Sequence, residues 1–177
     1  MIEAGFDPQK NTVTSTEKTE GDKIEMLDVF HSKGKCHGYI QFHGTHEEGR
    51  VIEITNRDGR LKLADSDLSR SARKQTNPSI AGHHGGGMKI AILIIMRRKN
   101  SHLVTILASN SEFAFSWRQE SGNLGLTCTK MDAAAREKVM QRSKKDFNAG
   151  LIPFVKDPGK DVQILIGVEG RRKDKFR

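Results

Sequence analysis

A glycine-dense turn that leads straight into an apolar run is the feature that most restricts how this chain can fold. Glycine occupies four of the six positions from residue 82 to residue 87, and the apolar run begins at Met88. Because glycine has no Cβ, such a turn can bend sharply and leave its amide groups facing an anion. A helix expected over residues 88–99 would add the positive end of its dipole. The segment therefore predicts a phosphate cradle, and the alternative is a plain turn between two elements.

Short apolar or alternating segments surround this turn, and turn residues separate them. They predict strands at residues 23–30, 37–42, 51–55, 103–107, 112–117, 124–129 and 162–166. Asp132 is a good N-cap for a second helix over Ala133–Asn148, which would end at Gly150. The polar residues 9–22 are expected to form a loop, and the polar stretch 57–87 a lid. This order predicts an α+β two-layer sandwich, in which a mixed, mostly antiparallel sheet carries helices on one face.

The length of 177 residues suits a single domain over residues 1–170, followed by a basic tail over 171–177. The two cysteines, Cys36 and Cys128, lie far apart in a chain without a signal-peptide pattern, which indicates a reducing compartment, cytoplasmic or nuclear. The longest apolar run, residues 90–96, is too short to span a membrane. We therefore expect an intracellular protein without a membrane partner.

Positive charge is concentrated in three places along the chain. The formal net charge is +8, and basic residues gather at 97–99, 136–145 and 171–177. Such clusters can bind polyanions, including nucleic acid. The alternative is that they are ordinary helix ends, an exposed helix face and a frayed tail. With one Trp and one Tyr, the chain lacks the interleaved rings of a platform on which single-stranded bases stack.

Four segments together resemble a known superfamily. They are the strand 52–56 with Gly59 after it, the box Gly82-His-His-Gly-Gly-Gly-Met-Lys89-Ile-Ala91, and the segments 111–117 and 161–167. In this order, with a polar lid over 61–80, the chain resembles the GHKL ATPases, and most of all a group of fungal proteins with a histidine-kinase-like ATPase domain. The resemblance covers nearly the whole chain. It implies a Bergerat-like sandwich, incomplete at its N-terminus, with ATP and Mg²⁺ held between the sheet and a helical layer.

The resemblance also implies which residues would hold the nucleotide. The nucleoside would lie against Asn56, Asp58 and Gly59, and the Asn56 amide can both donate to and accept from adenine. The phosphates would lie against a second group, namely Gly82, His84, Gly85, Gly87 and Lys89.

Three departures from the family pattern indicate a degenerate site. Gly86 stands where the second box usually carries Glu, and one extra residue separates Asn56 from Gly59. The catalytic helix of the family has the pattern Glu-x-x-x-Asn-x-x-Asp-Ala, and Met1-Ile-Glu3-Ala4 matches only its last four positions. The Glu that positions water and the Asn that binds metal would precede Met1, so the resemblance implies ATP binding without efficient hydrolysis. A working ATPase would require those two residues upstream, in a longer chain.

Other chemistry has little support in the residues. His31, Cys36, His37, His43 and His46 are close in sequence, but their spacing matches no common zinc motif. The serines have no His and Asp partners at a recognisable spacing, which argues against nucleophilic catalysis. We therefore predict no metal ligand and no catalytic residue. The alternative to nucleotide binding is a non-catalytic basic scaffold that binds nucleic acid or a protein partner.

Overall fold

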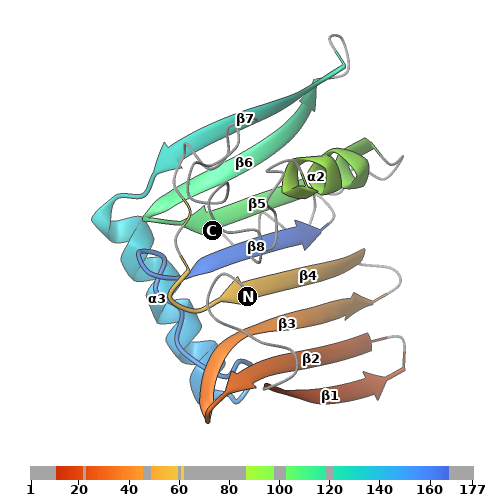
Figure 1. Ribbon diagram of the computed structural model, residues 1–177, viewed down its shortest axis with the longest axis vertical. Helices are drawn as coiled ribbons and strands as arrows, with labels where there is room; N and C mark the ends of the chain where they lie inside the picture. Colours follow the sequence, from red (N-terminus) through yellow and green to blue (C-terminus); the bar gives the residue numbers. More distant parts are fainter. Residues whose placement is uncertain are drawn as a thin grey trace.

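The computed structural model describes residues 11–21, 23–45, 49–59, 61, 87–97, 103–118 and 122–167. Within these ranges, eight strands form one sheet in the order β1-β2-β3-β4-β8-β5-β6-β7 (Figure 1). Every neighbouring pair of these strands is antiparallel. The elements are β1 Thr12–Glu20, β2 Lys23–Ser32, β3 Lys35–Thr45, β4 Gly49–Asn56, α2 Gly87–Arg97, β5 Leu103–Ala108, β6 Ser111–Arg118, β7 Asn123–Lys130, α3 Ala133–Asn148 and β8 Val162–Gly167.

Two tight turns show why the sheet is antiparallel. Lys33 and Gly34 connect β2 to β3, and both have positive φ, 49° and 76°. Ser109 and Asn110 connect β5 to β6, with φ of 52° and 57°. Two residues of positive φ in a two-residue loop are the pattern that matches the right-handed twist of a hairpin. A connection this short can join only antiparallel neighbours.

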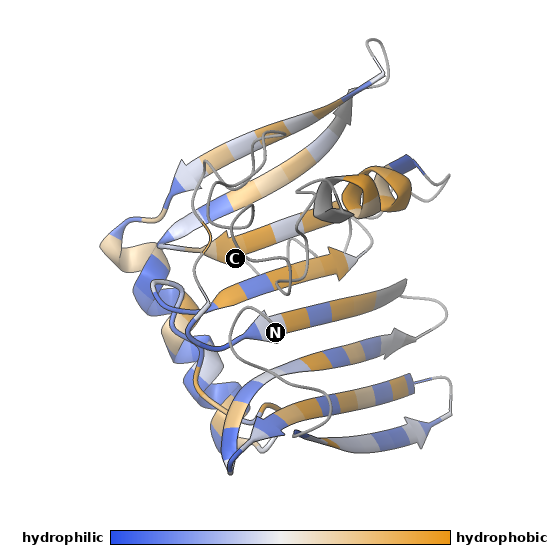
Figure 2. Ribbon diagram, in the orientation of Figure 1, coloured by the Kyte–Doolittle hydropathy of each residue, from blue (hydrophilic) through white to orange (hydrophobic). Residues whose placement is uncertain are grey.

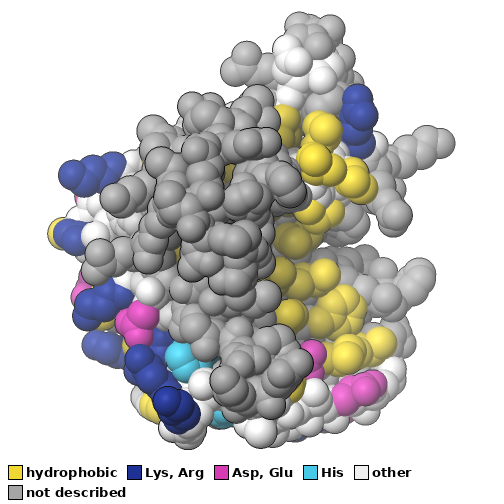
Figure 3. Space-filling view, in the orientation of Figure 1, with side chains coloured by type: hydrophobic (Ala, Val, Ile, Leu, Met, Phe, Trp, Pro, Cys, Tyr) yellow, Lys and Arg dark blue, Asp and Glu magenta, His cyan; other side chains and the backbone are white. Residues whose placement is uncertain are grey.

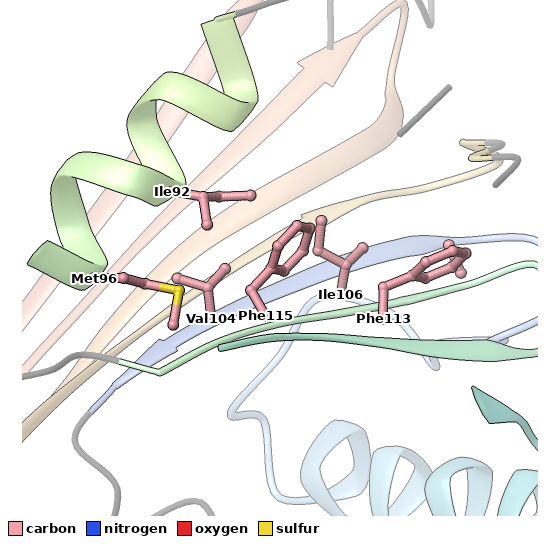
Figure 4. Packing of buried hydrophobic residues seen from close by; sticks show 7 residues of the cluster. Ile92, Met96, Val104, Ile106, Phe113 and Phe115 are labelled. Carbon is pink, nitrogen blue, oxygen red and sulfur yellow. The ribbon is translucent and has the colours of Figure 1, made fainter. Parts of the chain in front are cut away.

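α2 covers one face of the sheet, which we call the front face. Its residues Ile92 and Met96 are buried against side chains of β5 and β6 (Figure 4). That cluster consists of Val104, Ile106, Ala108, Phe113 and Phe115, with Val162, Ile164 and Ile166 of β8 packed against it. Burying a side chain of this size contributes about 1.5–3 kcal/mol. Figure 2 shows the same region, α2 with β5 and β8, as a largely hydrophobic part of the molecule.

α3 and the segment that follows it lie on the opposite face, the back face. Asp132 caps α3, because its Oδ1 accepts a hydrogen bond of 2.7 Å from the Ala135 amide. Ser143 is the buried residue of α3, and its hydroxyl accepts a 2.7 Å hydrogen bond from the Lys156 amide. Beyond the helix, Ile152 and Phe154 pack against Val29 and Tyr39 of the sheet. A second apolar cluster therefore lies between this segment and the back face of the sheet.

A buried polar cluster centred on Glu53 ties this back layer to the sheet. The Lys156 ammonium lies 2.7 Å from Glu53 Oε1, with only 9% and 5% of the two side chains exposed. The Tyr39 hydroxyl and the Thr55 hydroxyl donate to the same carboxylate oxygen. Each polar group thus has a partner, which is the condition under which buried charges are tolerated. No local pattern in the sequence marks this Glu53 cluster.

The expected fold class, an α+β two-layer Bergerat-like sandwich with a mixed sheet and helices on one face, is wrong. Every described strand pair is antiparallel, and the two described helices, α2 and α3, lie on opposite faces. The physical reason is visible in β5, where Val104 and Ile106 face the front, while Leu107, which follows Ile106 and faces the back, is also buried. A strand that is apolar on both faces needs a layer on each of them.

Most individual elements agree with the predictions, and one does not. The predicted strands from residue 23 onward, the helix after the glycine turn and Ala133–Asn148 are confirmed within a few residues. Gly150 adopts a positive φ of 69° directly after α3, as a helix-ending glycine should. The predicted loop over 9–22 is wrong, because residues 12–20 form β1, an exposed edge strand. Across the described part of the chain, neither helix has the length and apolarity to cross a bilayer.

Candidate nucleotide site

The front face carries a polar side chain at the point where β4 ends. Asn56, the last residue of β4, lies opposite Gly38 of β3 and Val162 of β8. Directly opposite residues of antiparallel strands point to the same face, and Val162 packs against the front cluster. The Asn56 side chain therefore points to the face on which α2 lies.

The side-chain oxygen of Asn56 has an unusual environment. Asn56 Oδ1 is buried and has no hydrogen-bond partner among the described residues. Leaving a buried acceptor without a donor costs about 1–3 kcal/mol, and such groups are uncommon in folded proteins. A ligand that donates a hydrogen bond would remove this cost, so the atom marks a candidate binding position.

Two glycines allow the backbone to come close to Asn56. A Cβ at Gly59 would lie 3.1 Å from Val162 Cγ2 and 3.4 Å from Asn56 Cβ. A Cβ at Gly38 would collide with the backbone carbonyl oxygen of Thr55. The structure therefore brings together two of the residues predicted for the nucleoside, Asn56 and Gly59, and adds Gly38, which the sequence analysis did not single out.

α2 is oriented with its first turn toward the end of the sheet at which Asn56 lies. Met96, near the end of the helix, lies beside Val104 near the start of β5, while Ile92, one turn earlier, is displaced in the direction that leads from Val104 to Ile106 (Figure 4). α2 therefore runs against β5, and its first turn is directed toward the end at which β5 finishes. Ile106 of β5 pairs with Ile164 of β8, so β8 begins at that end, next to Asn56.

Asp58, the second candidate for the nucleoside, is used differently. Its carboxylate lies 3.1 Å from the Lys35 ammonium, and its backbone adopts a positive φ of 55°. The hydrogen bond from Lys35 is the main reason why the pKa of this carboxyl lies below its ordinary value. The ion pair connects the turn after β4 to the start of β3. The structure therefore gives Asp58 a place in a turn, and its carboxylate is engaged with Lys35.

Asp161 connects the turn after β4 to the turn that begins at Asp157. This contact was not predicted from the sequence. The two carboxylate oxygens of Asp161 accept hydrogen bonds of 2.9 Å from the Asp58 amide and 2.8 Å from the Asp157 amide. Burial raises the pKa of Asp161, while the two amide donors act against that shift. The sequence Asp157-Pro158-Gly159 predicts a turn at this place. It does not predict that Asp161, just after this turn, contacts Asp58, more than 100 residues away.

The phosphate side of the predicted site falls largely outside the described residues. Gly82, His84 and Gly85 lie there, and so does most of the predicted lid over 57–87. Gly87 and Lys89 stand in the first turn of α2, and the Lys89 side chain is likewise outside the described part. The predicted helix start is thus confirmed, and the predicted contacts to phosphate stay predictions.

The described candidates for metal ligands are spread over two strands of the sheet, and His46 lies outside the described residues. His31 on β2 lies opposite Cys36 on β3, while His37 and His43 stand elsewhere on β3. Burial raises the pKa of the Cys36 thiol. Among the described residues, no group of three or more His, Cys, Asp or Glu side chains could hold a metal ion.

The described geometry therefore joins Asn56, Gly59 and Val162 on the front face, with the first turn of α2 directed toward their end of the sheet. The Asp58 carboxylate, in the turn between Asn56 and Gly59, is engaged with Lys35. Comparisons of the chain with protein-family models, curated proteins and solved structures find no significant match.

Proposed function

We propose that this chain binds ATP on the front face, between the end of β4 and the start of α2, and does not hydrolyse it efficiently. The observation that carries the proposal is the buried Asn56 Oδ1, to which no described residue donates a hydrogen bond. Adenine offers a donor in its exocyclic amino group, whereas guanine has an acceptor oxygen at the same ring position. The site should therefore prefer ATP over GTP.

The start of α2 is suited to the phosphates. Gly87 is its first residue, and the first amides of a helix have no partner within the helix and carry its positive dipole end. The resemblance to the second GHKL glycine box assigns Lys89 to the same phosphates. Mg²⁺ would be held mainly by phosphate and water oxygens, as is usual for this ion with nucleotides.

The proposal is supported by individual residues. The expected sandwich fold gives no support, because the sheet does not form it. Asn56 and Gly59 lie beside each other, as the nucleoside side of the resemblance implies. Gly86 in place of the usual Glu favours binding over turnover.

Thermal unfolding with and without nucleotide tests the proposal. A ligand at 100 times its Kd stabilises a protein by about 2.7 kcal/mol, which raises the Tm of a domain of this size by roughly 5–11 °C. We expect such a shift with ATP and Mg²⁺ and a much smaller one with GTP. Asn56→Ala should abolish the shift without lowering the Tm of the free protein, because it removes an acceptor that has no partner.

A variant pair at the two ends of α2 tests the phosphate side. Lys89→Ala should abolish the shift with ATP, whereas Arg97→Ala, in the last turn of the same helix, should keep it. Inorganic phosphate release should stay near the background level. A wild-type Tm that does not respond to millimolar ATP, or an unchanged response in Asn56→Ala, would contradict the proposal.

A further inference from the structure

The outward side of α3 is densely basic. α3 carries five basic and two acidic residues. Ser143 faces the sheet, and at 100° per residue Lys138 and Lys145 stand nearly opposite it, on the outer side. Arg142 and Lys144 flank them, and all four side chains are exposed. Figure 3 shows Lys and Arg side chains along the margin where Figure 1 places α3, away from the hydrophobic front.

The lysines of this surface are not engaged in ion pairs within the described residues. In the part of the chain that the structure describes, Lys138, Lys144 and Lys145 form no ion pair. Asp132 caps the helix. Glu137 and Asp146 keep their negative charges, but they leave α3 with a surplus of three positive charges from five basic residues. This surplus can attract an external anion.

The composition of the surface favours a phosphate backbone over other anionic partners. Protein interfaces are built around aromatic and aliphatic anchors and are depleted in lysine. A helix that lies in a membrane presents a broad apolar face toward the lipid. Here the exposed apolar residues, Phe147 and Leu151, stand only at the end of α3. Lys138 and Lys145 are about 10 Å apart along the axis, which corresponds to about three phosphate steps of one strand.

We propose that the outward side of α3 is a binding surface for the phosphate backbone of nucleic acid, with Lys138 and Lys145 as its central contacts. This surface lies on the opposite side of the sheet from the proposed ATP site, and it requires no nucleotide. Because the contacts reach phosphates and not base edges, binding should depend strongly on salt and little on sequence.

The test measures binding of the full chain, without ATP, to a fluorescent duplex DNA and a matched duplex RNA between about 50 and 200 mM salt. Lys138→Gln/Lys145→Gln should lower the affinity at least roughly tenfold at the low-salt end. It should also make the slope of log K against log salt shallower by about 1.8 for DNA. The control, Lys18→Gln/Lys23→Gln, has the same net charge but changes the β1–β2 hairpin, and it should leave both quantities unchanged.

Testing both nucleic acids distinguishes the two sources of phosphate. If Lys138→Gln/Lys145→Gln loses affinity for only one of them, that nucleic acid is the ligand. Vesicles rich in phosphatidylserine serve as a third arm. The proposal is overturned if neither nucleic acid binds at the lowest salt, if the two double variants lose affinity equally, or if only the vesicles bind. Circular dichroism of the folded variants checks that these exposed substitutions leave the fold intact.

Discussion

Removing Lys156 should destabilise the protein far more than removing any exposed lysine. In the native structure its ammonium lies 2.7 Å from Glu53 Oε1, and almost none of either side chain is exposed. Lys156→Met would leave the Glu53 carboxylate buried without a countercharge. Breaking a buried pair in this way typically costs about 3–5 kcal/mol, which corresponds to a Tm roughly 6–20 °C lower for a domain of this size.

The same variant should also acquire a characteristic pH dependence. Protonation of the unpaired Glu53 carboxylate removes the buried charge, so the loss of stability should shrink as the solution becomes acidic. Glu53→Gln/Lys156→Met should recover most of the lost free energy, because a neutral amide oxygen can still accept from Tyr39 and replacing both charges is often close to neutral.

Urea unfolding followed by circular dichroism measures these differences, with Lys160→Met as the matched control. Lys160 is 74% exposed in its ion pair with Asp157, and an exposed pair of this kind contributes at most about 1 kcal/mol. The reasoning fails if Lys156→Met costs no more than Lys160→Met, or if the double variant is as unstable as the single one.

Three further predictions concern the sheet and its layers. Burial, with Glu53 next to it, raises the pKa of Tyr39 above its ordinary value, so the stability from this group is present below about pH 10 and is lost as the pH rises beyond it. Since Tyr39 is the only tyrosine, tyrosinate absorbance should appear only together with unfolding. Tyrosinate absorbance in folded protein at pH 10 would be inconsistent with the burial. Gly38→Ala should cost about 1–3 kcal/mol by urea unfolding, because the new Cβ meets the Thr55 carbonyl oxygen, and an unchanged midpoint would argue against the close approach of β3 and β4. Asp132→Ala should cost about 1 kcal/mol by loss of the N-cap of α3, with Asp132→Asn as the control that keeps most of the stability.

Local signals identified most of the secondary structure. Asp132 before a run of helix formers and Gly150 after it predicted α3 at its observed bounds. Alternation and turn residues predicted β5, β6 and β7 as a meander, which is confirmed. β1 was missed because its residues are polar except for Val13, with all nine exposed, so no periodicity distinguishes it from a loop.

The candidate site was predictable only in part. Asn56 and Gly59 are close in sequence and end the same strand, so their proximity follows from local structure. The ion pair of Asp58 with Lys35 and its amide hydrogen bond to Asp161 depend on residues 23 and 103 positions away, which no local pattern reveals.

By itself, the sequence determined most of the strands and the two described helices, because capping and alternation act within a few residues. Tertiary structure alone decided that all the described strands pair antiparallel in one sheet, that α2 and α3 cover opposite faces, and that Glu53, Tyr39 and Lys156 meet in the interior. These outcomes depend on which distant surfaces exclude water together, and on the need of each buried polar group for a partner.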